Sequence, residues 1–173
     1  MRLAIRRANK SINLGVTRIL SGIVLGSLLA VSLCAVADTS ADPAIGTWKL
    51  NVAKSKARAG TLPQSETRTY TAADGGLTLS YKRTGADGKE STAKSTYKYD
   101  GKDYPISGTS DYDSINVKRI DAHNAESTQK RMGKAVGTTK RTVSKDGKTL
   151  TLVSKGTNTK GEEFDNTLVY DRQ

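Results

Sequence analysis

Residues 138–152 read TTKRTVSKDGKTLTL, and this stretch has the pattern of a β-hairpin. After the pair Asp146-Gly147, Leu150 and Leu152 alternate with threonines. An Asp-Gly pair is a strong hairpin signal because both central positions of a type I′ turn need positive φ. The stretch therefore predicts two antiparallel strands, each with one apolar face and one polar face.

Similar turn signals recur along the rest of the chain. They follow one another at nearly even spacing, with one longer interval between positions 100 and 121. β-Branched and aromatic residues alternate with Thr, Ser and Lys between the turns, and residues 52–58 could form one or two helical turns at most. The turns lie near residues 74, 87, 100, 121, 133, 147 and 160.

This spacing predicts an all-β domain over residues 45–173. We expect an antiparallel up-and-down β-barrel of about 8–10 strands, because closing a meander into a barrel leaves no exposed strand edge. A two-sheet sandwich is the alternative. Sandwiches usually need long crossovers, whereas this chain has one long interval, which contains Pro105. Residues 38–44 are expected to form a short segment before the barrel.

The N-terminus has the pattern of a secretory signal. Residues 1–18 carry five basic residues and no acidic residue, and residues 19–37 are mainly apolar. Ala35 and Ala37 supply the small side chains that signal peptidase reads. We therefore predict a signal peptide over residues 1–37 that is cleaved after Ala37, and an exported, periplasmic or secreted protein. An uncleaved membrane anchor is the alternative, since the apolar run is just long enough to span a bilayer.

Composition limits the chemistry of the mature chain. From Asp38 onward the chain has a net charge of +6, and about a fifth of its residues are strongly apolar. This low apolar fraction argues against a large helical enzyme core. Cys34 is the only cysteine and His123 the only histidine, and no phosphate-loop, nucleophile-elbow or metal-ligand spacing occurs. We predict a non-enzymatic protein with no catalytic residue, no metal ligand and no cofactor.

The start and end of the predicted barrel resemble a known family. Gly46-Thr47-Trp48 resembles the Gly-x-Trp of the first strand in lipocalins and fatty-acid-binding proteins, which together are the calycins. Residues 138–171 look like the last three strands of the fatty-acid-binding branch. The chain is also similar to small exported bacterial proteins of uncharacterised function with a lipocalin-like barrel, a resemblance that implies fold and compartment. That branch holds lipid carboxylates with an Arg-x-Tyr in the last strand, where this chain has Leu168 before Tyr170.

The resemblance also implies a structural role for three residues. In lipocalins an arginine near the end of the barrel stacks on the first-strand tryptophan, a cation–π contact worth about 0.5–2 kcal/mol. Arg172 is placed to make this contact with Trp48. Gly46, Trp48 and Arg172 are therefore expected to close one end of the barrel.

Strand parity places three arginines on the apolar side of their strands. Arg83, Arg119 and Arg141 each continue an alternating apolar series, and adjacent residues in a strand face opposite sides. An inward arginine is costly unless it is paired or meets an anion. One interpretation is an anion-binding interior for a carboxylate or phosphate group. The other is that Arg83 and Arg119 reach solvent, while Arg141 pairs with a carboxylate such as Glu126.

Tyrosines complete the candidate ligand-binding residues. Tyr81, Tyr97 and Tyr170 either give a pocket apolar walls with hydroxyl groups or simply fill the barrel. The first hypothesis is a non-enzymatic carrier that holds a small, partly apolar, anionic ligand inside the barrel. The second is an envelope or secreted interaction protein with a filled barrel and a basic surface for an anionic polymer or a partner protein. The Lys-Arg pairs lack interleaved aromatic residues, so we expect no nucleic-acid binding, and we expect a monomer.

Overall fold

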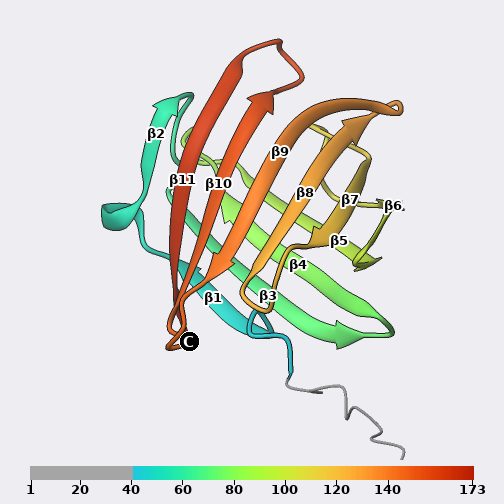
Figure 1. The fold of residues 1–173 in the computed structure, drawn as a ribbon. Coiled ribbons are helices and arrows are strands. Elements are labelled where there is room, and N and C mark those ends of the chain that lie inside the picture. Colours follow the sequence, from blue (N-terminus) through green and yellow to red (C-terminus); the bar gives the residue numbers. More distant parts are fainter. Residues whose placement is uncertain (1–40) are drawn as a thin grey trace, which may run out of the picture. The chain divides into compact units, whose positions relative to one another are not determined.

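A computed structural model describes residues 41–173 of the chain (Figure 1). The predicted signal peptide, residues 1–37, lies outside the described residues. Cleavage after Ala37 and export therefore stay predictions. Within residues 41–173, no helix is long and apolar enough to cross a membrane.

The described residues form eleven strands, all paired antiparallel, and one 3₁₀ turn. Ten strands follow one another around the sheet in the order β5-β4-β3-β1-β11-β10-β9-β8-β7-β6. In chain order the elements are β1 (Gly46–Leu50), η1 (Val52–Lys54), β2 (Lys56–Ala59), β3 (Ser65–Ala73), β4 (Gly76–Thr84), β5 (Glu90–Lys98), β6 (Asp100–Pro105), β7 (Ser114–Arg119), β8 (Asn124–Arg131), β9 (Lys134–Val143), β10 (Thr149–Thr157) and β11 (Glu163–Arg172).

The two ends of this strand order meet and nearly close the barrel. Lys94 of β5 and Ser107, just after β6, exchange two backbone hydrogen bonds of 3.0 Å. Gly108 makes this approach possible, because its φ is +86° and a Cβ there would overlap the carbonyl oxygen of Thr92. The predicted antiparallel up-and-down barrel is confirmed, and the sandwich alternative is wrong.

One segment differs from its predicted conformation. Helical turns were expected at most over residues 52–58, but only η1 is helical, and the chain then forms β2. This short strand pairs with β11 at Lys56↔Thr167, beyond the point where β11 pairs with β1. The first half of β11 would otherwise be an open edge, so β2 covers backbone groups that need partners.

The closed end of the barrel is filled around Trp48. The Arg172 guanidinium carbon lies 4.2 Å from the centroid of the Trp48 ring, and the indole nitrogen donates to the Ala44 carbonyl at 2.8 Å. Arg172 also donates to the carbonyl oxygens of Ile45 and two other residues. A Cβ at Gly46 would come within 2.5 Å of Arg172 Nη1, so glycine leaves the space that the guanidinium occupies.

Candidate ligand-binding site

A cavity of about 620 Å³ occupies the other end of the barrel. Three connections between strands supply residues to its lining at the mouth: Pro63 before β3, Ala86 between β4 and β5, and Asn158 between β10 and β11. Tyr112, between β6 and β7, also lines it. The strands bring their inward side chains to the walls below these loops.

Small inward residues on β8, β9 and β10 contribute to the hollow at this end. The inward positions of β8, β9 and β10 include Ala125, Gly137, Ser154 and Gly156, and the two glycines leave room for the ring of Phe164. Gly156 pairs in register with Gly137 on one side and with Phe164 on the other. The facing wall has large inward residues, among them Tyr70, Leu79 and Tyr97.

A buried carboxylate and two arginines lie beside the cavity. Glu66 is 1 % exposed, and its Oε1 accepts from Arg68 Nε at 2.9 Å and from the Tyr170 hydroxyl at 3.1 Å. Its Oε2 accepts from Arg83 Nε at 2.6 Å. Arg68 also donates to the Tyr70 hydroxyl at 3.0 Å. This set of residues is called the Glu66 cluster below.

The Glu66 cluster carries one excess positive charge. Burial by itself would raise the pKa of Glu66, but the charges of Arg68 and Arg83 lower it below its ordinary value, so the carboxyl is ionised. Two guanidinium groups thus share one carboxylate. Both arginines line the cavity.

Arg83 is the member of the cluster with donors to spare. Its Nε binds Glu66, while its two Nη atoms make no hydrogen bond to any residue in the range 41–173. Its side chain is 32 % exposed, against 10 % for Arg68, whose three nitrogens all bind Glu66 or Tyr70. The geometry therefore presents the Nη atoms of one arginine to whatever enters the cavity.

Arg141 is held in a second, deeper cluster. Its Nη1 donates to the Tyr97 hydroxyl at 3.2 Å and its Nη2 to the Tyr99 hydroxyl at 2.6 Å. Asp42, from the segment before β1, lies 3.8 Å from Nη2 and accepts from Tyr99 at 2.5 Å. Burial raises the pKa of Tyr97 well above its ordinary value, so this hydroxyl stays protonated.

The carboxylate that lies near Arg141 is that of Asp42 and not that of Glu126. One interpretation of the sequence pairs Arg141 with a carboxylate and gives Glu126 as an example, but Glu126 is exposed and lies opposite Lys140 in the β8–β9 register. Asp42 takes that role. The sequence does not identify this carboxylate because Asp42 is remote in sequence, and nothing local indicates that its segment approaches Arg141.

Half of the predicted ligand-binding residues line the cavity. Those in the lining are Arg83, Arg141 and Tyr97, and those outside it are Arg119, Tyr81 and Tyr170. Arg119 sits at a strand end, 41 % exposed, and pairs with Asp42 at 2.6 Å. Tyr81 packs beneath Arg83, and Tyr170 donates to Glu66, so both support the cluster from behind. Direct ligand contact by these three residues is not supported by their placement.

Sequence reasoning missed Glu66 and Arg68, although a signal was present. Glu66, Arg68 and Tyr70 alternate along β3 with the same parity, and Tyr70 is an aromatic residue of the core. An apolar series marks the inward face of several other strands, and β3 has no such series before Tyr70. Charged residues at alternating positions that lead to a core tyrosine would have placed the pair inside.

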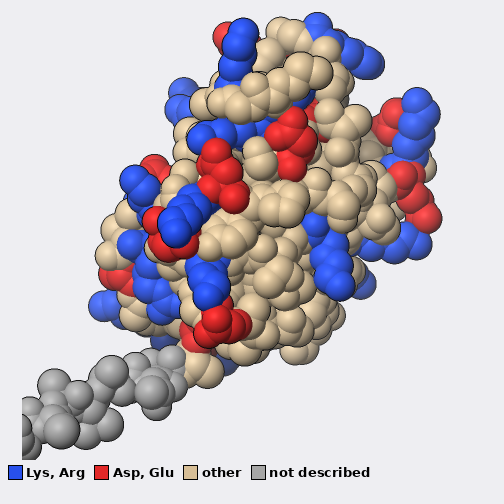
Figure 2. Space-filling view, turned by 90° about the vertical axis from the view of Figure 1, so that its right-hand side faces the viewer, with Lys and Arg blue, Asp and Glu red and all other residues tan. Residues whose placement is uncertain are grey.

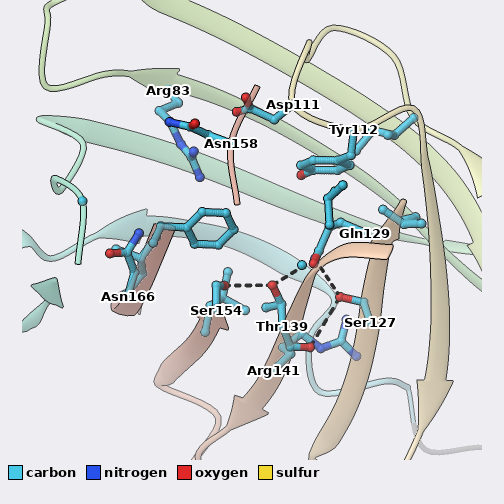
Figure 3. A pocket seen from close by; sticks show the side chains of 18 of the residues that line it. Arg83, Asp111, Tyr112, Ser127, Gln129, Thr139, Arg141, Ser154, Asn158 and Asn166 are labelled. Atoms are coloured by element: carbon cyan, nitrogen blue, oxygen red, sulfur yellow. Dashed lines mark hydrogen bonds between the residues drawn. The ribbon is translucent and has the colours of Figure 1, made fainter. Parts of the chain in front are cut away.

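Polar side chains follow the wall formed by β8, β9 and β10. Gln129 Nε2 donates to Thr139 Oγ1 at 2.9 Å and lies 3.3 Å from Ser127 Oγ (Figure 3). Thr139 and Ser154 share a hydrogen bond of 2.8 Å. These four side chains all line the cavity and are called the polar strip below.

Of the comparisons with known proteins, only the one with solved structures finds a similar protein. No protein-family model matches the chain, and no curated protein matches it. Among solved structures, it is similar to zebrafish ileal bile acid-binding protein complexed with cholic acid, at 9 % sequence identity and a TM-score of 0.46. The match covers 76 % of this chain and 99 % of that chain. The fold assignment itself rests on strand order and register.

Residues 41–173 contain no group of His, Cys, Asp or Glu side chains that could hold a metal ion.

Proposed function

We propose that this protein is a non-enzymatic binding or carrier protein that holds a small, partly apolar, anionic ligand inside its barrel in an exported compartment. The observation that carries the proposal is the cavity of about 620 Å³ with Arg83 in its lining. Ligand pockets typically occupy about 300–1,000 Å³ and combine apolar walls with a few polar groups. Export is proposed from the signal pattern of residues 1–37.

The charge of the Glu66 cluster supports an anionic ligand on its side of the cavity, although the lining as a whole also includes the carboxylates of Asp111, Glu126, Glu162 and Glu163. One net positive charge remains in the Glu66 cluster, and the Nη atoms of Arg83 can donate to a carboxylate or phosphate in a fork geometry. Leu79, Ile115 and Val117 supply apolar surface nearby. An anion with an apolar body would therefore find matched contacts for both of its parts.

The alternative, a filled barrel with a basic outer surface, has less support. The cavity argues against a filled interior. Several outer lysines also pair with carboxylates, and basic and acidic residues are intermixed on the face that Figure 2 shows. An extended surface of one sign, which an anionic polymer would need, does not appear on that face.

The test is a fluorescence titration with anilinonaphthalene sulfonate, an anionic aromatic probe. We expect saturable binding, and Arg83→Met should weaken it by about 1.5–3 kcal/mol, the range for a hydrogen bond to a charged group. The matched control is Lys82→Met, because Lys82 is the neighbouring cation on the outer face, paired with Glu90. Its effect should stay within about 0.5 kcal/mol. Equal effects of the two substitutions, or no binding, would contradict the proposal.

A further inference from the structure

The two walls of the cavity differ in chemistry, and this bears on the class of ligand; the inference rests on the proposed carrier function. Strands β8–β11 cross the barrel in front of β3–β5 (Figure 1). Tyr70, Leu79 and Tyr97 give the β3–β5 wall apolar and aromatic surface beside the arginines of the Glu66 cluster. The opposite wall carries the polar strip.

The polar strip has hydrogen-bonding capacity that its own network does not use. Each hydroxyl group offers one donor and two acceptor sites, and the amide of Gln129 offers two donors and an oxygen. Gln129 Oε1 has no partner within residues 41–173. Gln129 Oε1 is already buried, but an alkyl chain laid along this wall would also cover the hydroxyl groups of the strip and give no hydrogen bond in return, which is unfavourable. A ligand with hydroxyl or amino groups would replace the lost water.

An aromatic side chain lies next to the polar strip. Phe164 is the only phenylalanine of the chain and lines the cavity. A Cβ at Gly156 would come within 2.8 Å of its Cζ, and a Cβ at Gly137 within 3.3 Å, so the ring packs against two glycines. These glycines reserve the space for the ring, and its exposed surface offers a stacking partner for a flat ligand.

The anion-binding end lies across the cavity from the polar strip. In Figure 3, Arg83 and Tyr112 lie on one side of the space, and Thr139 and Ser154 on the other. A ligand that spans the cavity would meet a guanidinium group, aromatic surface and hydroxyl groups together. We propose that the ligand is an aromatic carboxylate with at least one hydroxyl or amino substituent, and not a long-chain alkyl carboxylate.

Calorimetric titration of the purified full chain with three probes tests this proposal. The probes are para-coumarate; cinnamate, which lacks the hydroxyl group; and decanoate, which lacks the ring. We expect para-coumarate to bind at least tenfold more tightly than either of the others. Decanoate binding as tightly as para-coumarate would overturn this inference and leave the carrier function standing. No binding of these probes or of anilinonaphthalene sulfonate would overturn both.

Two isosteric substitutions test whether the polar strip produces the preference for para-coumarate over cinnamate. Thr139→Val removes a hydroxyl group from the polar strip, and the preference for para-coumarate over cinnamate should fall below threefold. Thr138→Val is the control, because Thr138 is adjacent in sequence but exposed on the outer face, and it should keep the full preference. Ser154→Ala tests the same strip if Thr139→Val does not fold. A preference that stays tenfold in the variant of the strip, or that falls equally in the control, would overturn the inference.

Discussion

The two ends of the barrel are built from the same strands but filled differently. At the closed end, β10 and β11 contribute Leu150 and Tyr170, which are completely buried beside Trp48. Toward the mouth the inward residues of β10 become Ser154 and Gly156. The comparison shows that a decrease in side-chain volume along a strand is enough to separate a packed core from a cavity, without any change in topology.

Two arginines of the cavity lining, Arg141 and Arg83, differ in the same way with depth. At the bottom of the cavity Arg141 donates to two tyrosine hydroxyls and lies near Asp42, so both of its Nη atoms are engaged. Closer to the mouth, Arg83 engages only its Nε. The deeper arginine thus stabilises the fold through its partners, and the arginine nearer the mouth keeps guanidinium donors available for a ligand.

Removing the indole ring at the closed end should have the largest effect. Trp48→Ala deletes a completely buried side chain and its contact with Arg172, so we expect a loss of about 3–5 kcal/mol in the free energy of unfolding. Urea denaturation followed by circular dichroism measures it. A loss below about 1 kcal/mol would show that the closed end is not the main packed core.

The next largest effect is expected from the shared carboxylate. Glu66→Gln leaves Arg68 and Arg83 without their common anion, and breaking a buried ion pair costs about 3–5 kcal/mol. We expect a loss near the lower end, about 3 kcal/mol, because Arg83 is partly exposed and can be hydrated. Urea denaturation at neutral pH measures it. Unchanged stability would mean that the cluster does not stabilise the barrel.

Acid should reproduce part of this effect in the unmodified protein. The pKa of Glu66 in the folded state is below its ordinary value of 4.5, so the unfolded chain takes up the proton first as the pH falls. The stabilisation is therefore complete above pH 4.5 and is lost as the pH drops through the lower, folded-state value. The measurement is the free energy of unfolding against pH. Glu66→Gln should flatten the acid limb, and an unchanged slope would contradict the assignment.

A smaller effect is expected at the contact between Gly46 and Arg172. Gly46→Ala puts a side chain at a φ of +134° and a Cβ within 2.5 Å of Arg172 Nη1, so we expect a loss of about 1–3 kcal/mol. The fluorescence of Trp48, the only tryptophan, should change as the guanidinium group moves away. Gly88→Ala is the control, because Gly88 also has positive φ but has nothing within 4 Å of its Cβ position. It should alter stability without altering the fluorescence.

The sequence by itself determined the barrel and its closed end. Asp-Gly turns and alternating apolar residues are local signals, and they indicate the strand spacing and, where a strand has an apolar series, its inward face. Parity also placed Arg83 and Arg141 on the inward side, where both line the cavity. The strand β2 was missed because its reason for forming is the open edge of β11, which no local pattern shows.

Only the tertiary structure decided which inward groups are engaged and which are available. Asp42 reaches Arg119, 77 residues away, and Tyr170 reaches Glu66 across 104 residues. Whether an arginine keeps free donors depends on such partners, and these are set by how the strands come together around the barrel. The volume of the cavity depends in the same way on the sum of all inward side chains. Parity can therefore name the residues that face inward, but the three-dimensional pairing determines which of them can meet a ligand.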